Sequence, residues 1–212
     1  MGTSGMKLTW SPASNVALYG QTTQVPLAHD AKVLVALAPD WSMGGSQNML
    51  DELRFADGWD NKNWGDVLKP DALFTMATAN GAKVVALDDK IGHLKEGYVA
   101  DIVVYTGNSA APYDAILAAT PKEVRLVMIG GVPLYGDKDL QALAPAKPGC
   151  EAIDICGSPK FLCVATTDTS NKLDQTYTTI KAALEQAMTD ADTQTAGDGF
   201  TFAPLAPLVK CK

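Results

Sequence analysis

The chain has 212 residues, a formal net charge of −7 at neutral pH and a hydrophobic content of 47%. Charged residues make up 19%, a balance typical of a folded globular protein and not of a disordered one. The acidic balance, without a cluster of Lys and Arg, argues against nucleic-acid and acidic-membrane partners. No apolar run reaches the length of a membrane span, and the first residues lack the pattern of a signal peptide, so neither feature is expected.

The first forty residues predict two βα units. Lys7–Trp10 is a short strand candidate, followed by a polar loop containing Asn15 and a short helix over about 23–29. The apolar run 33–38 predicts a parallel strand that is buried on both faces. Asp40 follows its carboxyl end, where α/β barrels place catalytic groups. The alternative is a loop carboxylate that only accepts hydrogen bonds from backbone amides.

Two further candidates are expected in loops, one of them in the glycine-rich loop after this strand. Trp41 in this loop and Asn15 in the earlier one are candidate substrate-binding residues at the mouth of a pocket. Loop packing for Trp41 and a structural turn for Asn15 are equally good interpretations.

A helix is expected from 48 to about 56, then an exposed loop over 58–65, and then a longer helix over 71–87.

From residue 91 the pattern changes from helices to strands. The apolar segments 100–105 and 124–129 predict strands, and a short helix is expected between them over 112–119. A glycine pair after the second strand predicts a hairpin turn into a third strand over 132–135. We expect these three strands to form one sheet, separate from the sheet of the first forty residues.

The tail is distinguished by its cysteines. After a Pro/Ala-rich linker over 144–149, it carries Cys150, Cys156, Cys163 and Cys211, and an amphipathic helix is expected over about 172–188. No pair has the short spacing of a structural zinc site, so two disulfides of unknown pairing are the main prediction, with four free thiols as the alternative. Disulfides would indicate an oxidising compartment, periplasmic or extracellular.

Five short motifs follow one another along the first 136 residues: 10–15, 37–42, 76–82, 91–97 with 100–104, and 127–136. In this order they resemble the amidohydrolase superfamily, in the branch of imidazolonepropionase, cytosine deaminase and chlorohydrolase-like enzymes. The first two motifs resemble the seventh and eighth strands of that family's barrel, and the third resembles the helix that follows. The last two resemble parts of its small β-sandwich domain.

The resemblance implies an α/β fold. It consists of the C-terminal βα units of a (β/α)8 barrel over 1–90, a sandwich-derived segment over 91–143, and a cysteine-bearing tail over 144–212. Two of eight strands cannot close a barrel, so exposed sheet edges and self-association are expected.

The resemblance also implies a role for Asp40. In the family, the aspartate after the eighth strand binds or faces the metal centre and handles the proton of the attacking water. The family's histidine ligands lie on strands that this sequence does not contain, and His29 and His93 fall outside the matching motifs. A divalent metal, with zinc as the expected ion, is therefore implied for the complete enzyme only, and no cofactor is expected for this chain alone.

Two functions remain open on these grounds. The chain is either the incomplete, inactive C-terminal portion of an amidohydrolase that cleaves non-peptide C–N bonds in a small molecule, or a stand-alone binding or structural module derived from that fold. Whether it is an enzyme by itself is uncertain. The first residues run directly into the strand-seven motif, so we expect Met1 to lie inside a longer reading frame that encodes a complementary N-terminal segment.

Overall fold

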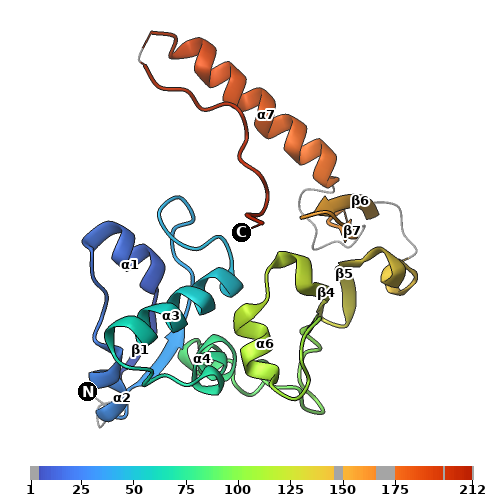
Figure 1. Ribbon diagram of the computed structural model, residues 1–212. Coiled ribbons are helices and arrows are strands. Elements are labelled where there is room, and N and C mark those ends of the chain that lie inside the picture. The colour runs from blue at the N-terminus through green and yellow to red at the C-terminus, as the bar shows by residue number, and fades with distance from the viewer. Residues whose placement is uncertain (1–4, 146–149, 166–174, 198, 212) are drawn as a thin grey trace.

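The computed structural model describes residues 5–145, 150–165, 175–197 and 199–211. Two parts follow each other in the chain, namely helices around a two-stranded sheet and then a five-stranded sheet (Figure 1). The first part contains β1 (Lys7–Trp10), α1 (Pro12–Tyr19), α2 (Val25–Asp30), β2 (Leu34–Leu37), α3 (Met49–Asn63), α4 (Pro70–Ala77) and α5 (Ala79–Val84).

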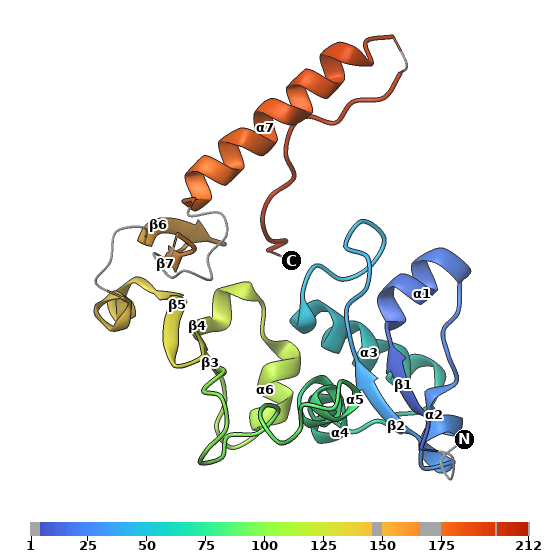
Figure 2. The same ribbon diagram turned by 180° about the vertical axis from the view of Figure 1, so that it is seen from behind.

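The two strands of the first part pair in parallel, with Trp10 opposite Leu37. Helices α2, α4 and α5 pack against them, and α3 packs against α1 and α4 (Figure 2). The core between these layers consists of apolar side chains from both strands, α2, α3, α4 and α6: Trp10, Val25, Val35, Leu37, Leu53, Ala56, Leu68, Leu73, Met76 and Leu117. The predicted parallel pair is confirmed, and it leaves Asp40 just past the carboxyl end of β2.

The polar loop predicted around Asn15 is wrong, because residues 12–19 form helix α1. Pro12 occupies the first turn, where its missing N–H costs nothing, and Gly20 ends the helix in the left-handed conformation with φ 72°. These two residues set the limits of a helix whose eight residues are too few to give a clear apolar period. Asn15 therefore lies on a helix, one turn from its start.

The exposed loop predicted over 58–65 is also wrong. Helix α3 continues through Gly58 to Asn63. Asp60 is 1% exposed, and its carboxylate accepts hydrogen bonds from the amides of Val67 (3.2 Å) and Leu68 (2.7 Å). These contacts tie the last turn of α3 to the chain that leaves it, and they outweigh the low helix propensity of Gly58.

The single helix predicted over 71–87 is divided in two at Thr78. The Thr78 hydroxyl donates to the carbonyl of Phe74 at 2.8 Å, a contact that bends helices. The new direction of α5 lets the side-chain amide of Asn80 donate to the Val35 carbonyl of β2 at 2.8 Å. The break therefore joins α5 to the strand pair.

The second part is an antiparallel sheet in the order β3-β4-β5-β7-β6. Its elements are β3 (Ile102–Tyr105), α6 (Pro112–Ala118), the 3-10 turn η2 (Pro121–Glu123), β4 (Val124–Ile129), β5 (Val132–Asp137), η3 (Lys138–Leu143), β6 (Cys150–Ile155) and β7 (Ser158–Cys163). The prediction that the first three strands share one sheet, separate from β1 and β2, is confirmed. Strand β7 pairs with β5, so the division expected after residue 143 falls between strands of one sheet.

Two side chains of β7 attach the tail to this sheet. Phe161 is fully buried, in a small core with Leu126 and Cys163. Lys160 is 2% exposed and donates to the carbonyls of Lys122 and Val124, both at 2.9 Å. It also forms an ion pair with Asp137. A buried ammonium needs such partners, and here three of them come from the segments around β4 and β5.

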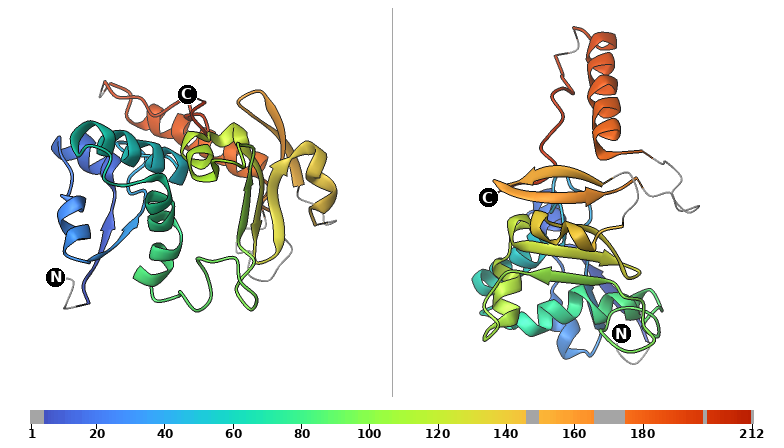
Figure 3. Two further views of the ribbon diagram at one scale, coloured as in Figure 1. Left: turned by 60° about the horizontal axis from the view of Figure 1, so that its bottom comes forward. Right: turned by 90° about the vertical axis from the view of Figure 1, so that its right-hand side faces the viewer.

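Both predicted disulfides are present. Cys150 pairs with Cys163 across the β6–β7 hairpin, and Cys156 pairs with Cys211 near the end of the chain. Helix α7 (Tyr177–Gln194) starts later and ends later than predicted, and residues 172–174 of the expected helix lie outside the described residues. It has no buried residue and projects away from both sheets (Figure 3). Among the described residues, no helix is long and apolar enough to cross a membrane.

Candidate functional site

Asp40 is exposed at the carboxyl end of β2. Its carboxylate oxygen Oδ2 accepts a hydrogen bond from the Ser14 hydroxyl at 2.9 Å, which joins the end of β2 to helix α1. The same hydroxyl lies 3.4 Å from the Ser11 carbonyl, a longer and weaker contact. Ser14 is only 1% exposed, so the donor is held in the core while the acceptor stays accessible.

The loop after Asp40 passes close to the same helix. The Gly45 amide donates to the Trp41 carbonyl at 2.7 Å. A Cβ added at Gly45 would lie 2.8 Å from that carbonyl oxygen and 3.0 Å from Ser14 Cβ. Only glycine fits this close approach. The loop is therefore closed into a turn that lies against the residue that binds Asp40.

Asn15 takes part in a different set of contacts. Its side-chain oxygen accepts from the Thr22 hydroxyl at 3.0 Å, and that hydroxyl accepts from the Trp10 indole nitrogen at 2.8 Å. Trp10 is 1% exposed, so this chain satisfies a buried donor. The contacts support the structural interpretation of Asn15, and its expected substrate contact stays a prediction.

Trp41 is 46% exposed, and its ring lies next to Gly44, where an added Cβ would come within 3.3 Å of the ring. One face is thus packed on the loop and the other is open to solvent. This placement is compatible with the predicted contact to a substrate, which stays untested.

Two residues close to Asp40 were not predicted as site residues, namely Ser14 and Glu52. Glu52 on α3 is fully buried, and its Oε1 accepts from the Ala13 amide at 3.1 Å. Its Oε2 is buried without a hydrogen-bond partner among the described residues. Burial raises the pKa of Glu52, and the charges of Asp40 and Asp51 raise it further, against the opposing effect of Ser46 and the Ala13 amide. The signal in the sequence was a carboxylate at a helical position that faces the core, between Met49 and Leu53.

Residues that could hold a metal do not gather around Asp40. In the described part of the chain, no group of three or more His, Cys, Asp or Glu side chains has the geometry of a metal site. The His29 side chain is 56% exposed beside Asp30, and the His93 ring packs edge-on against Tyr98. A catalytic zinc needs about three protein ligands, and the described residues do not form such a set.

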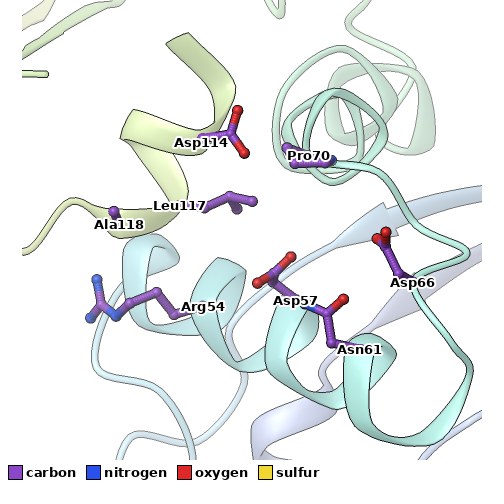
Figure 4. A pocket seen from close by; sticks show the side chains of 8 residues that line it. All are labelled: Arg54, Asp57, Asn61, Asp66, Pro70, Asp114, Leu117 and Ala118. Carbon is purple, nitrogen blue, oxygen red and sulfur yellow. The ribbon is translucent and has the colours of Figure 1, made fainter. Parts of the chain in front are cut away.

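Two hollows flank helix α3. One, of about 530 Å³, lies behind the loop after Asp40 and is lined by residues of α1, the loop and α3, together with Lys210 of the tail. The other, of about 610 Å³, lies between α3 and α6 and receives the carboxylates of Asp57, Asp66 and Asp114 (Figure 4). Burial and the charges of Asp66 and Asp60 raise the pKa of Asp57. Neither hollow is lined by Asp40.

Curated proteins similar to this chain include two archaeal deaminases. The 5-methylthioadenosine/S-adenosylhomocysteine deaminase of Thermococcus onnurineus is 31% identical over 146 residues, covering 64% of this chain and 34% of that protein. The enzyme of the same name from Pyrococcus horikoshii is 37% identical over 109 residues, covering 49% of this chain and 25% of that protein. The chain thus spans only about a third or less of the length of these relatives.

Solved structures show the same fold over a similar share. Guanine deaminase of E. coli superposes with a TM-score of 0.57 at 23% identity, covering 65% of this chain and 36% of that protein. Atrazine chlorohydrolase of Arthrobacter aurescens TC1, solved in complex with zinc, superposes with a TM-score of 0.54 at 21% identity, covering 68% and 33%. The model of the Amidohydrolase family matches residues 5–134, which include β1, β2, the Asp40 loop, β3, β4 and the start of β5. The chain belongs to the amidohydrolase family and corresponds to a C-terminal part of its fold.

Proposed function

We propose that the chain is the C-terminal portion of a metal-dependent amidohydrolase of the deaminase type, in which Asp40 handles the proton of the attacking water. The observation that carries the proposal is the position of Asp40 at the carboxyl end of a parallel strand, with its carboxylate held by Ser14. The names of the curated relatives support a purine derivative with an exocyclic amine as the substrate class.

The chemistry needs a base that later acts as an acid. Water adds to the carbon that bears the amine, the C–N bond breaks, and ammonia leaves with the proton that the water gave up. A carboxylate can accept that proton and deliver it to the leaving nitrogen within one turnover. Asp40 is accessible to a substrate, while its hydrogen bond to Ser14 restricts its orientation.

A divalent metal, with zinc as the proposed ion, belongs to the complete enzyme. Such an ion lowers the pKa of water and polarises the reacting group. This part of the chain would contribute Asp40 to that centre, and the preceding barrel strands would contribute the histidines. Trp41 would cover the substrate, and Asn15 would hold the α1 side of the pocket.

The second candidate is a stand-alone binding or structural module. The pairing of β7 with β5 and the buried Lys160 attach the tail to the sheet, as a module would require. However, a module would not need an accessible carboxylate held by a buried serine. We therefore favour the enzyme fragment.

The test compares this chain with a longer protein in which the preceding barrel strands of the family are joined to it. We expect the longer protein to bind zinc and to release ammonia from 5-methylthioadenosine or S-adenosylhomocysteine, and the given chain to do neither. Zinc content by mass spectrometry of metals and a coupled ammonia assay measure both. One-to-one zinc binding by the given chain, or an inactive longer protein that holds its metal, would contradict the proposal.

Asp40→Asn in the longer protein should lower kcat by roughly 100- to 10,000-fold, because the amide keeps the shape of the side chain and loses the proton-accepting charge. The circular dichroism spectrum and the unfolding temperature should stay unchanged. Asp114→Asn, in the hollow on the far side of α3, is the matched control and should keep its activity.

A further inference from the structure

The starting point is the carboxyl group of Glu52, which is fully buried on α3. Oε1 accepts from the Ala13 amide at 3.1 Å, and Oε2 has no partner among the described residues. An unpaired polar atom in the core is costly, and an apolar side chain of the same length would avoid that cost. Stability alone therefore does not explain a glutamate at this position.

The hydrogen bond that Glu52 accepts from the Ala13 amide lies at the start of α1. Ala13 is the second residue of that helix, where backbone amides have no acceptor within the helix. Ser11, which precedes α1, makes no side-chain cap, so the acceptor comes from α3, 39 residues further along the chain. A carboxylate at this end of a helix is also favoured by the helix dipole. Glu52 thus fixes the first turn of α1 relative to α3.

The residue after Ala13 is Ser14, whose hydroxyl holds Asp40 at 2.9 Å. Rotation or fraying of the first turn of α1 would move this hydroxyl away from the end of β2. The contacts therefore form a sequence from Glu52 through the Ala13 amide and Ser14 to Asp40. It joins α3, α1 and the end of β2, three elements whose relative placement the local sequence does not determine.

The effect of nearby charges on the pKa of Glu52 also connects this residue with Asp40. Asp40 and Asp51 both raise the pKa of Glu52 after the larger effect of burial. Asp40 is thus close enough to Glu52 for their charges to interact. Gly45, in the loop after Asp40, lies against Ser14, so this loop meets the same turn of α1.

We infer that Glu52 is a positioning residue for Asp40, acting through the first turn of α1 and the Ser14 hydroxyl. Its effect on turnover rests on the proposed function, whereas the sequence of contacts does not. If Glu52 had only a structural role, its replacement would lower the stability of the whole first part, the helices around β1 and β2. A positioning Glu52 would change α1 and Asp40 selectively.

The first test uses the chain as it is, with amide hydrogen exchange and the 13C signal of the Asp40 carboxyl measured by NMR at one pH. Glu52→Met fills the space, removes the acceptor and also removes the unpaired oxygen. We expect the Ala13 amide to exchange roughly tenfold faster or more, in line with the loss of one hydrogen bond, and the Asp40 signal to shift. The unfolding temperature should stay near that of the unchanged chain.

Three variants complete this test. Glu52→Gln keeps an acceptor oxygen and should restore both the slow exchange and the Asp40 signal. Ser14→Ala should shift the Asp40 signal while the Ala13 amide stays protected from exchange. This result would show that Ser14 lies between the first turn of α1 and Asp40 in the sequence of contacts. Asp57→Asn lies on the same helix but faces the other hollow, and it should change neither (Figure 4). An unshifted Asp40 signal in Glu52→Met would overturn the inference, as would a general loss of stability without selective exchange at α1.

The second test uses the longer protein. Glu52→Met should lower kcat about tenfold or more with little change in KM, because a displaced base fails in the chemical step. Glu52→Gln should come close to the unchanged enzyme. If the longer protein is active and Glu52→Met turns over normally, the positioning role is wrong. If the longer protein is inactive, the proposed function fails, and the NMR measurements still decide whether Glu52 holds Asp40.

Discussion

At the residue scale, the candidate site depends on side chains that satisfy one another across elements. Ser14 is buried and holds an exposed Asp40, while Trp10, Thr22 and Asn15 form a separate hydrogen-bonded chain beneath it. Asp40 could be predicted from its place after an apolar strand. Ser14 could not be predicted in the same way, because the distance between helix α1 and the end of β2 depends on how β1 and β2 pair.

Glu52 gives this site a defined pH dependence of stability. The pKa of Glu52 is higher in the folded chain than in the unfolded chain, where it is about 4.5. The free energy of unfolding is therefore highest below about pH 4.5 and falls as the pH rises through the folded pKa, because the buried group must then ionise. Glu52→Gln does not ionise, so its stability relative to the unchanged chain should rise over that pH range and then level off. Urea unfolding at a series of pH values measures this difference. Glu185→Gln, at an exposed position on α7, should show no such trend.

Gly45→Ala probes the contact between the Asp40 loop and α1. The added Cβ would come within 2.8 Å of the Trp41 carbonyl oxygen and 3.0 Å of Ser14. We expect a loss of about 1–3 kcal/mol in the free energy of unfolding, as for other overpacked sites. Gly58→Ala has open space around it and a helical backbone, so it should be neutral or stabilising. Equal effects of the two substitutions would contradict the close approach.

At the element scale, strand pairing attaches the tail to the rest of the sheet, and two disulfides cross-link the tail internally. Cys150–Cys163 joins opposite residues of the β6–β7 hairpin and closes 13 residues, whereas Cys156–Cys211 closes 55 residues and ends in the exposed C-terminal segment. Lys210, next to Cys211, donates its amide to the Gln47 side chain at 3.0 Å. The longer disulfide therefore connects the sheet to the loop after Asp40.

We expect the two disulfides to be reduced in order. Cys163 is 3% exposed and lies in the sheet core, while Cys211 is open to solvent. Thiol exchange requires access to the sulfur, so mild reductant should open Cys156–Cys211 first. Alkylation followed by peptide mass spectrometry at increasing reductant would show the order. Simultaneous loss of both would mean that the hairpin does not protect its own bridge.

At the scale of the whole molecule, the parallel sheet formed by β1 and β2 has only two strands among the described residues. In the described structure, β1 and β2 have only each other as partners, so each has one unpaired edge. Unpaired edges and the apolar surface beside them favour association with another chain. The chain covers 34% of the Thermococcus onnurineus relative, and we propose that further barrel strands of the complete protein occupy these edges.

The given chain should therefore self-associate in a concentration-dependent way. Sedimentation velocity over a range of about tenfold in concentration measures this. Addition of a separately expressed N-terminal segment of the longer protein should replace the self-association by a one-to-one complex, because both compete for the same edges. A chain that stays monomeric at all concentrations would show that helices or the tail protect the edges.

The sequence alone determined the features that depend on local pattern. Apolar runs of strand length marked β2, β3 and β4, the glycine pair marked the turn into β5, and the even set of cysteines marked two disulfides. Tertiary structure decided the rest: that residues 12–19 are helical, that α3 extends through Gly58, that Thr78 divides one helix into two, and that β7 joins the sheet beside β5. The pairing of β7 with β5 and the direction of α5 depend on contacts between distant residues, since Lys160 reaches the Val124 carbonyl and Asn80 reaches the Val35 carbonyl. The same reason hid Glu52 and Ser14, whose role exists only where α1, α3 and the end of β2 meet.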